Sequence, residues 1–214
     1  MLTLPPILDQ SYCYISDNPT HRQILHDWGL QYDLPAWVPQ RDVSRALFGQ
    51  GGIRTVMACE QHYGPFVWGT QFANVHATFH YQPNAIVIDG ETFAGSEQYY
   101  QAMKSFGQPD HDMAKAAIRI ADPMTAWHLG QHYSIRPDWR SVSAAVMTKA
   151  VTAKFTQDKG LQQLLLSTGE HPLVQLKPSD AYWGTGRENN GRNKLGAILQ
   201  QLRTAIRQGQ YPTL

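Results

Sequence analysis

The sequence predicts an α+β fold that is mostly helical, with a small β-sheet and an N-terminal extension. Apolar residues recur at helical spacing in several segments after residue 95, most clearly over 193–207. Short strand-like runs occupy residues 66–93. Residues 1–65 instead show short, broken patterns rich in Pro, Trp and Tyr. We therefore expect an extension of unknown role over 1–65 and a single domain over 66–210.

Composition places the chain among globular proteins and gives no sign of a strongly basic, disulfide-rich or membrane-spanning protein. The 214 residues are 42% hydrophobic and 16% charged, with a formal net charge of +1. This charge gives no strong bulk attraction to nucleic acid or acidic membranes, so an anionic partner has to be bound by local groups. The cysteines, Cys13 and Cys59, do not make a disulfide framework. With no signal peptide or membrane span visible, we expect a cytoplasmic protein.

Two adjoining patterns predict the strands. Residues 75–81 alternate apolar and polar side chains, which is typical of a half-buried strand. The segment AIVIDGETF, residues 85–93, contains Asp89-Gly90 between two strand-like runs, and this dipeptide favours a hairpin turn. PLVQL, residues 172–176, is a further candidate strand.

Helical patterns account for most of the remaining chain. Ser96 is the expected N-cap of a helix that opens the stretch 95–107, and Asp122-Pro123 predicts a cap followed by proline at the first helical position. GQGG at 49–52 predicts a loop. The other helices are expected over residues 19–29, 41–48, 110–121, 122–132, 141–156 and 193–207.

The stretch GSEQYYQAMKSFG, residues 95–107, is the first candidate for chemistry. Glu97, Gln101 and Lys104 follow i, i+4, i+7 spacing and share one helix face. A carboxylate and an amine that line a cleft can serve as acid/base and nucleophile. The alternative is a surface helix with an ordinary charge pair, which is common.

The second candidate is SDAYWGTGRENNGRN, residues 179–193. Asp180 and Glu97 together would supply the two carboxylates that glycosidic cleavage uses. The alternative is a capped turn with a core tryptophan and a helix N-cap at Asn193. Stacking on a base or ring is open to Tyr182, Trp183 and Trp139, and phosphate binding to Arg187, Arg192, Lys194 and a run of backbone amides.

The histidine spacings do not predict a metal site. His76 and His80 lie four apart in strand-like sequence, and His128 and His132 lack the acidic partner of a zinc-binding helix. The sequence has neither a Walker loop nor the motif GxGxxG. We expect no metal and no cofactor.

Eight segments of the chain form an ordered set. They are FAN at 72–74, DGETFAGSEQYYQAMKSF at 89–106, the basic helix around Arg119, DW at 138–139, VMTKAVTAKFTQ at 146–157, LLLSTGEHPLVQ at 164–175, DAYWGTG at 180–186 and GRNKLGAIL at 191–199. In this order they resemble the NADAR (NAD- and ADP-ribose-associated) family of YbiA-like N-glycosidases. The resemblance covers about two-thirds of the chain, and the shared order of eight segments makes it specific.

The resemblance implies a mostly helical α+β domain that cleaves the bond between ribose C1 and a base or amine nitrogen. It implies as substrate either ADP-ribosylated guanine in DNA or RNA, or a phosphorylated ribosylaminopyrimidine of riboflavin synthesis. It implies activity roles for Glu97, Trp139 and Asp180, and a Schiff-base role for Lys104. The implied substrate-binding residues are Phe72, Asn74, Tyr100, Gln101, Arg119, Trp183, Gly184, Gly186, Arg187 and Asn193.

The chain departs from the family pattern at a few positions. Ala73 stands where serine is usual, and Tyr100 stands where phenylalanine is common. Ser105-Phe106 shifts the usual spacing between lysine and phenylalanine by one residue. Residues 1–65 have no counterpart in the minimal family domain. These departures bear on substrate choice more than on the fold.

A different class of function competes with catalysis. The chain would then be a non-catalytic module that binds ADP-ribose or a related nucleotide. The presence of Glu97, Lys104 and Asp180 favours an enzyme, because a binding module does not need all three. The sequence leaves open which base departs and which of the carboxylates, Glu97 or Asp180, is the acid.

Overall fold

A computed structural model describes residues 4–74 and 85–210 of the chain. The chain divides into two compact units. Unit 1 comprises residues 1–73 and 164–203, and unit 2 comprises residues 74–163 and 204–214. The predicted strand over 75–81 lies outside the described residues. Over those residues the fold is α+β and mostly helical with small sheets, which confirms the predicted fold class.

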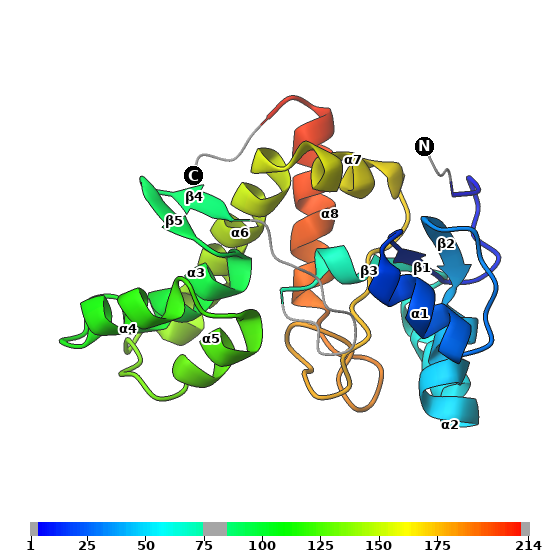
Figure 1. The fold of residues 1–214 in the computed structure, drawn as a ribbon, viewed down its shortest axis with the longest axis horizontal. Helices are drawn as coiled ribbons and strands as arrows, with labels where there is room; N and C mark the ends of the chain where they lie inside the picture. The colour runs from blue at the N-terminus through cyan, green and yellow to red at the C-terminus, as the bar shows by residue number, and fades with distance from the viewer. Residues whose placement is uncertain (1–3, 75–84, 211–214) are drawn as a thin grey trace. The chain divides into compact units, whose positions relative to one another are not determined.

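Unit 1 is built around a three-stranded sheet of order β2-β1-β3 (Figure 1). The strands are β1 (Tyr12–Ile15), β2 (Ala36–Pro39) and β3 (Val67–Gly69). Strand β1 pairs antiparallel with β2 and parallel with β3. The extension therefore shares a sheet with a strand of the expected 66–210 domain. An isolated bridge joins Val67 to Leu173, which is the pairing that the described residues show for the candidate strand at 172–176.

The first helices of unit 1 follow local signals. Helix α1 (Pro19–Asp27) has Asn18 as its N-cap, whose side chain accepts a hydrogen bond from the His21 amide at 2.8 Å. Helix α2 (Gln40–Tyr63) is far longer than expected, because helical structure resumes after a kink at Gly49. The prediction of a loop over 49–52 was wrong. Gly52 allows a close approach instead, since a Cβ there would lie 2.0 Å from the Ser44 carbonyl oxygen.

The rest of unit 1 includes the 3-10 helix η1 (Thr70–Phe72) and the C-terminal part of α7 (Lys159–Ser167). Helix α7 was not predicted. Its start is marked by Asp158, whose carboxylate accepts a hydrogen bond from the Leu161 amide at 2.9 Å. Helix α8 (Lys194–Arg207) confirms the helix expected over 193–207. One apolar cluster of the unit holds Val56, Cys59, Phe66 and Val174.

Unit 2 opens with the predicted hairpin. Strands β4 (Ile86–Ile88) and β5 (Glu91–Phe93) pair antiparallel. Asp89 and Gly90 both have positive φ, at 53° and 77°. These are the conformations that the tight turn demands.

Helix α3 (Ser96–Ala102) lies inside unit 2, and each of its residues is buried. It contacts three further helices, namely α4 (His111–Ile118), α5 (Pro123–Leu129) and α6 (Trp139–Gln157). The 3-10 helix η2 (Met103–Ser105) follows it directly. Ser96 is the first helical residue, so the prediction of Ser96 as N-cap was wrong. The predicted Asp122 cap of α5 is confirmed by hydrogen bonds from the amides of Met124 and Thr125.

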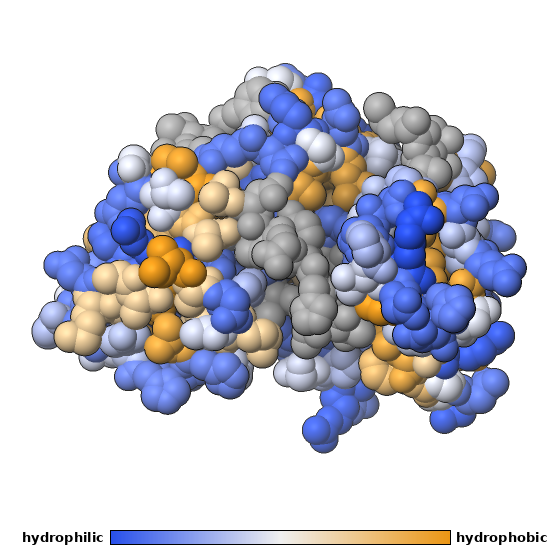
Figure 2. Space-filling model, viewed as in Figure 1, coloured by the Kyte–Doolittle hydropathy of each residue, from blue (hydrophilic) through white to orange (hydrophobic). Residues whose placement is uncertain are grey.

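The surface of unit 2 carries apolar side chains on and beside α4 and α5 (Figure 2). Met113, Ile120 and Trp127 are exposed there. Over residues 4–74 and 85–210, no helix combines the length and apolar character that crossing a membrane requires. The same residues contain no group of three or more His, Cys, Asp or Glu side chains arranged to hold a metal ion.

Candidate active site

Glu97 is a buried carboxylate of unit 2. It lies in the first turn of α3, where the helix dipole favours a negative charge, and only 4% of it is exposed. Its Oε1 accepts a hydrogen bond from Gln101 Nε2 at 2.6 Å, and its Oε2 accepts one from Asn74 Nδ2 at 3.1 Å. Two neutral amides therefore orient the carboxylate without cancelling its charge.

Asn74 is itself fixed by the start of α3. Ser96 Oγ donates a hydrogen bond to Asn74 Oδ1 at 2.7 Å. The Sδ of Met147, on α6, lies 3.0 Å from Asn74 Nδ2. Sequence reasoning missed this role of Ser96, because a serine at a helix start reads first as a cap. Its position beside Glu97 was the available signal.

Lys104 is the buried amine of the same stretch. It lies on η2 and is 9% exposed. Burial lowers its pKa, and the nearby charge of Glu97 opposes that shift without cancelling it. Its backbone is anchored by a hydrogen bond from the Arg136 amide to the Lys104 carbonyl at 2.7 Å. A lysine of this kind supplies neutral, nucleophilic amine more readily than an exposed one.

An aromatic pair joins α3 to the start of α6. The rings of Tyr100 and Trp139 lie with centroids 4.9 Å apart and planes at 58°. Gln101 packs closely against Gly130: a Cβ added to Gly130 would lie 2.1 Å from Gln101 Oε1. That oxygen is buried without a hydrogen-bond partner among the described residues. Unit 2 thus brings together Asn74, Glu97 and Gln101, and pairs Tyr100 with Trp139.

Arg119 lies at the C-terminal end of α4. Its carbonyl accepts a hydrogen bond from the Ala94 amide at 2.7 Å, which places its backbone beside the segment that leads into α3. Its side chain is exposed. Its role as a substrate contact stays a prediction.

In unit 1, residues 177–193 form a compact loop, here called the 177–193 loop. Asp180 Oδ1 accepts hydrogen bonds from the amides of Tyr182 at 2.9 Å and Trp183 at 2.8 Å. The rings of Tyr182 and Trp183 are T-shaped with centroids 4.8 Å apart. The Arg192 guanidinium lies 5.8 Å from the Tyr182 ring centroid. One oxygen of Asp180 is thus used to build the turn that presents the aromatic pair.

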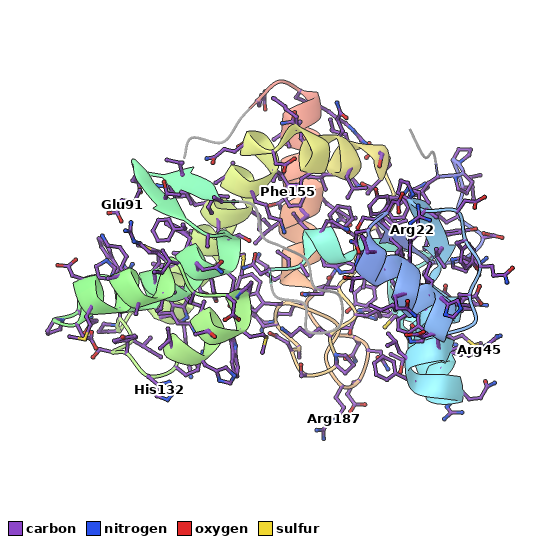
Figure 3. All side chains as sticks on the ribbon, viewed as in Figure 1. Arg22, Arg45, Glu91, His132, Phe155 and Arg187 are labelled. Atoms are coloured by element: carbon purple, nitrogen blue, oxygen red, sulfur yellow. The ribbon has the colours of Figure 1, made fainter. Side chains whose placement is uncertain are left out.

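Most amides of the 177–193 loop are already hydrogen bonded, which limits the predicted phosphate site. Gly186 donates to the Asp180 carbonyl and Arg192 to the Ala181 carbonyl. The first amides of α8, those of Lys194 and Leu195, also donate within the loop, to the carbonyls of Tyr182 and Trp183. A phosphate would therefore depend on side chains. Arg187 is exposed and extends away from the ribbon of the loop (Figure 3).

Three predicted ligand residues of the loop have structural roles. Gly184 and Gly186 lie where a Cβ would come within 2.7 Å of Lys177 and 2.8 Å of Ala181. The Asn193 side chain accepts from the Gln175 amide at 3.0 Å and donates to the Leu173 carbonyl at 2.7 Å. Phe72, also in unit 1, is fully buried with its ring 5.7 Å from that of Trp68. Contacts of these residues with a substrate stay predictions.

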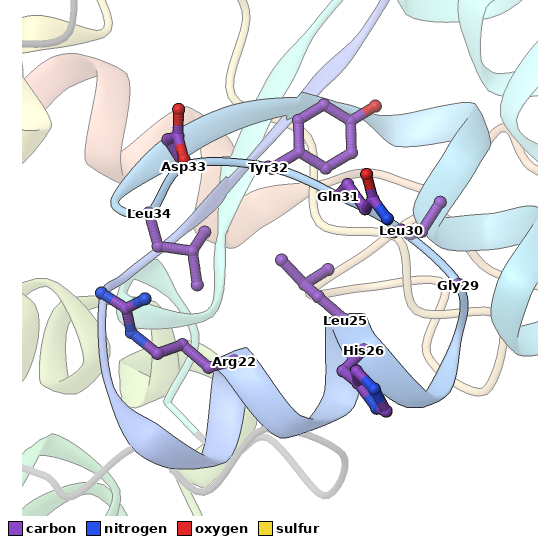
Figure 4. Close-up of a pocket in the computed structure, with 9 residues that line it drawn as sticks. All are labelled: Arg22, Leu25, His26, Gly29, Leu30, Gln31, Tyr32, Asp33 and Leu34. Carbon is purple, nitrogen blue, oxygen red and sulfur yellow. The ribbon is translucent and has the colours of Figure 1, made fainter.

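A cavity of about 650 Å³ lies elsewhere in unit 1, between α1 and residues 29–34 (Figure 4). Leu25 and Leu34 point into it, and Arg22 and His26 line it from α1. None of the residues predicted to act on substrate lines this cavity.

Comparison with known proteins places these residues in a family. The NADAR domain matches residues 59–207. The N-glycosidase YbiA of Escherichia coli (strain K12) is 41% identical over 123 residues, which are 56% of this chain and 75% of that protein. An N-glycosidase of Nostoc punctiforme is 35% identical over 129 residues, covering 59% of this chain and 83% of that protein.

Two further similarities extend the comparison. A riboflavin biosynthesis protein of Vibrio vulnificus is 34% identical over 130 residues, covering 60% of this chain and 35% of that protein. The NMR structure of the E. coli protein YbiA is similar with a TM-score of 0.53 and 36% identity, over 67% of this chain and 81% of that chain. The match over residues 59–207, which is more than half of the sequence, shows that this chain belongs to the NADAR domain family.

Proposed function

We propose that the chain is an N-glycosidase that hydrolyses the bond between C1 of a phosphorylated ribose and a nitrogen of a base or amine. Its relatives named N-glycosidase support this class of activity. The observation that carries the proposal is the Glu97 carboxylate, held by Asn74 and Gln101 on the helix that runs directly into the segment of buried Lys104.

Glu97 stabilises the charge that develops on the sugar. As the C1–N bond breaks, the ribose ring gains oxocarbenium character, with positive charge shared by C1 and the ring oxygen. A carboxylate fixed in advance by two amides and shielded from water stabilises that charge without having to reorganise.

Lys104 provides a covalent route. Its neutral amine forms a bond to C1 while the bond from C1 to the departing nitrogen breaks, and that nitrogen takes up a proton. The lysine nitrogen then loses a proton, the ring oxygen takes up a proton and its bond to C1 breaks, which leaves an imine between C1 and Lys104 Nζ. Water adds to C1 of this imine, the C1–lysine bond breaks, and the lysine leaves as the amine while C1 becomes the aldehyde of the released sugar. Apart from water, this route requires no oxidant, metal or other co-reactant. The lowered pKa of Lys104 supports the route because the attacking amine has to be neutral.

Asp180 and the aromatic side chains complete the proposal. The resemblance assigns Asp180 to the same reaction, and we propose that it protonates or orients the departing nitrogen. Trp139, packed on Tyr100, and Trp183, packed on Tyr182, offer flat apolar surfaces of the kind that a base or ribose stacks on.

The first substrate class that we propose is a phosphorylated ribosylaminopyrimidine. Relatives named for riboflavin biosynthesis, from Vibrio vulnificus and Zea mays, support it. The net charge of +1 also suits a small substrate better than a long polyanion, whose binding is built from many phosphate contacts.

The second substrate class is ADP-ribose attached to guanine in DNA or RNA. The 177–193 loop favours it through exposed Arg187 together with Arg192, which stacks on Tyr182. Two guanidinium groups on one loop suit a pyrophosphate, and the aromatic rings of Tyr182 and Trp183 suit a purine. Because both cysteines are free and buried, we also propose a reducing, cytoplasmic location.

Mass spectrometry of the products tests the activity. Wild type and Asp180→Asn are incubated with a phosphorylated ribosylaminopyrimidine, and in parallel with an oligonucleotide that carries ADP-ribosyl-guanine. Release of the base from either substrate by wild type, and its loss in Asp180→Asn, is the expected result. If folded wild type releases nothing but binds ADP-ribose in a calorimetric titration, the chain is a binding module and the proposal is wrong.

A further inference from the structure

The C-terminal end of α2 contacts the 177–193 loop with two side chains. Tyr63 Oη donates a hydrogen bond to the Gly191 carbonyl at 2.6 Å. Cys59, one turn earlier, places its Sγ 3.7 Å from Asn189 Oδ1. Helix α2 lies within the N-terminal extension over residues 1–65, and these contacts join residues about 130 positions apart in sequence.

The apolar surroundings hold this end of α2 in place. Cys59 is fully buried with Phe66 and Val174, and Tyr63 packs against the same cluster. The helix ends at Gly64, whose φ of 73° turns the chain toward β3. Tyr63 therefore reaches the loop from a fixed base. Its hydroxyl is protonated at neutral pH, and burial raises its pKa further.

A single peptide group connects Tyr63 to the segment of Asp180. The Gly191 carbonyl and the Arg192 amide lie at opposite edges of one peptide plane. Tyr63 holds the carbonyl edge, and the amide edge donates to the Ala181 carbonyl at 2.8 Å. Ala181 directly follows Asp180, whose own carbonyl accepts from the amides of Gly184 and Gly186.

The same plane can adopt few other positions. A Cβ on Gly191 would lie 2.4 Å from the Gly184 carbonyl oxygen, so the backbone at Gly191 is in close contact with the backbone at Gly184. The Gly191 amide also donates to the Thr185 carbonyl at 2.7 Å. A shift of the Gly191–Arg192 peptide would therefore be passed to residues 181–185.

We propose that Tyr63 is a positioning residue for the reaction, acting through the Gly191–Arg192 peptide on the segment that carries Asp180 and Trp183. The inference rests on the proposed function for its catalytic part. It also gives the N-terminal segment a role, because α2 supplies part of the framework that shapes the loop. Tyr63 itself contacts backbone and takes no part in the chemistry.

The test compares two phenylalanine variants that each remove one hydroxyl. Tyr63→Phe deletes the donor to Gly191. Tyr32→Phe is the matched control, because Tyr32 also lies in unit 1 but donates its hydroxyl to Asp42, at 2.8 Å, and not to the loop. Amide hydrogen exchange at Arg192 and Gly191 reports on the loop directly. Steady-state kinetics on the substrate that wild type cleaves report on Asp180 through kcat.

We expect faster exchange of the Arg192 and Gly191 amides in Tyr63→Phe alone, and a fall in kcat of about tenfold with KM changed far less. The two variants should have similar melting temperatures. Unchanged exchange in Tyr63→Phe, or an equal loss of kcat in Tyr32→Phe, would overturn the inference. A wild-type protein that cleaves neither substrate would count against the proposed function. Because amide exchange does not depend on turnover, the exchange data would still show whether Tyr63 holds the Gly191–Arg192 peptide.

Discussion

Asn74 Nδ2 lies 3.1 Å from Glu97 Oε2, and the same asparagine accepts the Ser96 hydroxyl at 2.7 Å. One side chain thus fixes both the first residue of α3 and the carboxylate that follows it. Gln101 holds the other oxygen, so two amides orient the carboxylate. A carboxylate fixed in this way suits the stabilisation of a positive charge that develops during the reaction.

Lys104→Met should abolish covalent trapping of substrate. If the Lys104 amine bonds to ribose C1, borohydride reduction during turnover should add the sugar mass to the peptide that contains Lys104. The wild-type rate should also fall as pH drops through the lowered pKa of this lysine, because protonation removes the nucleophile. Peptide mapping after reduction measures the first effect, and initial rates against pH measure the second.

Lys115→Met is the matched control for this trapping. Lys115 forms a partly exposed ion pair with Glu91 at 2.8 Å in the same unit, so its loss should leave trapping and rate intact. A Lys104→Met variant that retained the wild-type rate would contradict the covalent route, although direct attack by water would remain open.

Lys154→Met should change how stability depends on pH. Burial lowers the pKa of Lys154 from 10.5 to about 7, and the charge of Asp158 opposes the shift. Between pH 7 and 10.5 the unfolded state binds more protons, so the free energy of unfolding of wild type rises with pH there. The gain is at most about 1.4 kcal/mol per pH unit. Below pH 7 both states are protonated and the penalty of burying the charge is fully present.

Urea unfolding at pH 6 and pH 9 measures this difference. Lys154→Met lacks the titrating group, so its advantage over wild type should be large at pH 6 and smaller at pH 9. Lys149→Met, which removes a surface ion pair with Asp89, should show no such trend. Equal pH slopes for wild type and Lys154→Met would show that the lysine is already charged in the folded state.

The cysteines should resist alkylation in the native protein. Burial raises the pKa of Cys13 to about 12 and that of Cys59 to about 11, so little thiolate exists at pH 8. Intact mass after iodoacetamide treatment should show no adduct in buffer and two adducts in denaturant. Rapid labelling of either thiol in the folded chain would mean that its surroundings open far more readily than the packing implies.

Gly191→Ala should disrupt the 177–193 loop. The new Cβ would lie 2.4 Å from the Gly184 carbonyl oxygen, a distance that forces the backbone to move. We expect a loss of roughly 1–3 kcal/mol in stability and a larger loss of activity. Thermal unfolding and turnover assays measure the two effects.

Gly51→Ala is its control in the same unit, because the nearest atom to a Cβ there lies 4.0 Å away. A helical glycine replaced by alanine should be neutral or stabilising. If Gly191→Ala behaved like Gly51→Ala, the loop would be less tightly packed than the geometry indicates.

Local sequence signals predicted the elements that depend on neighbouring residues. The Asp89-Gly90 turn and the Asp122 cap both follow from chemistry within a few positions. The extent of α2 did not, because Gly52 is required by contact with the Ser44 carbonyl and not by a turn. The sequence GQGG is compatible both with a loop and with a kinked helix. Only the packing of one helical stretch of α2 against the other distinguishes the two structures.

The candidate site shows a similar division. Helical spacing placed Glu97 and Gln101 on one face, and their hydrogen bond confirms that relation. The burial of α3 on all sides was not visible in a stretch so polar, because its partners come from α4, α5 and α6. The contact of Tyr63 with Gly191 left no local signal either, since it joins residues far apart in the chain.

The most direct test of the account is base release by Glu97→Gln, with Glu91→Gln as its control. Glu97→Gln removes the negative charge and introduces a side chain nearly isosteric with glutamate. The control residue, Glu91, lies on β5 in a partly exposed ion pair. We expect Glu97→Gln to fold but to lose roughly 100-fold or more of kcat on the substrate that wild type cleaves, and Glu91→Gln to retain it. A folded Glu97→Gln with wild-type turnover would contradict the central claim that this carboxylate stabilises the cation at C1.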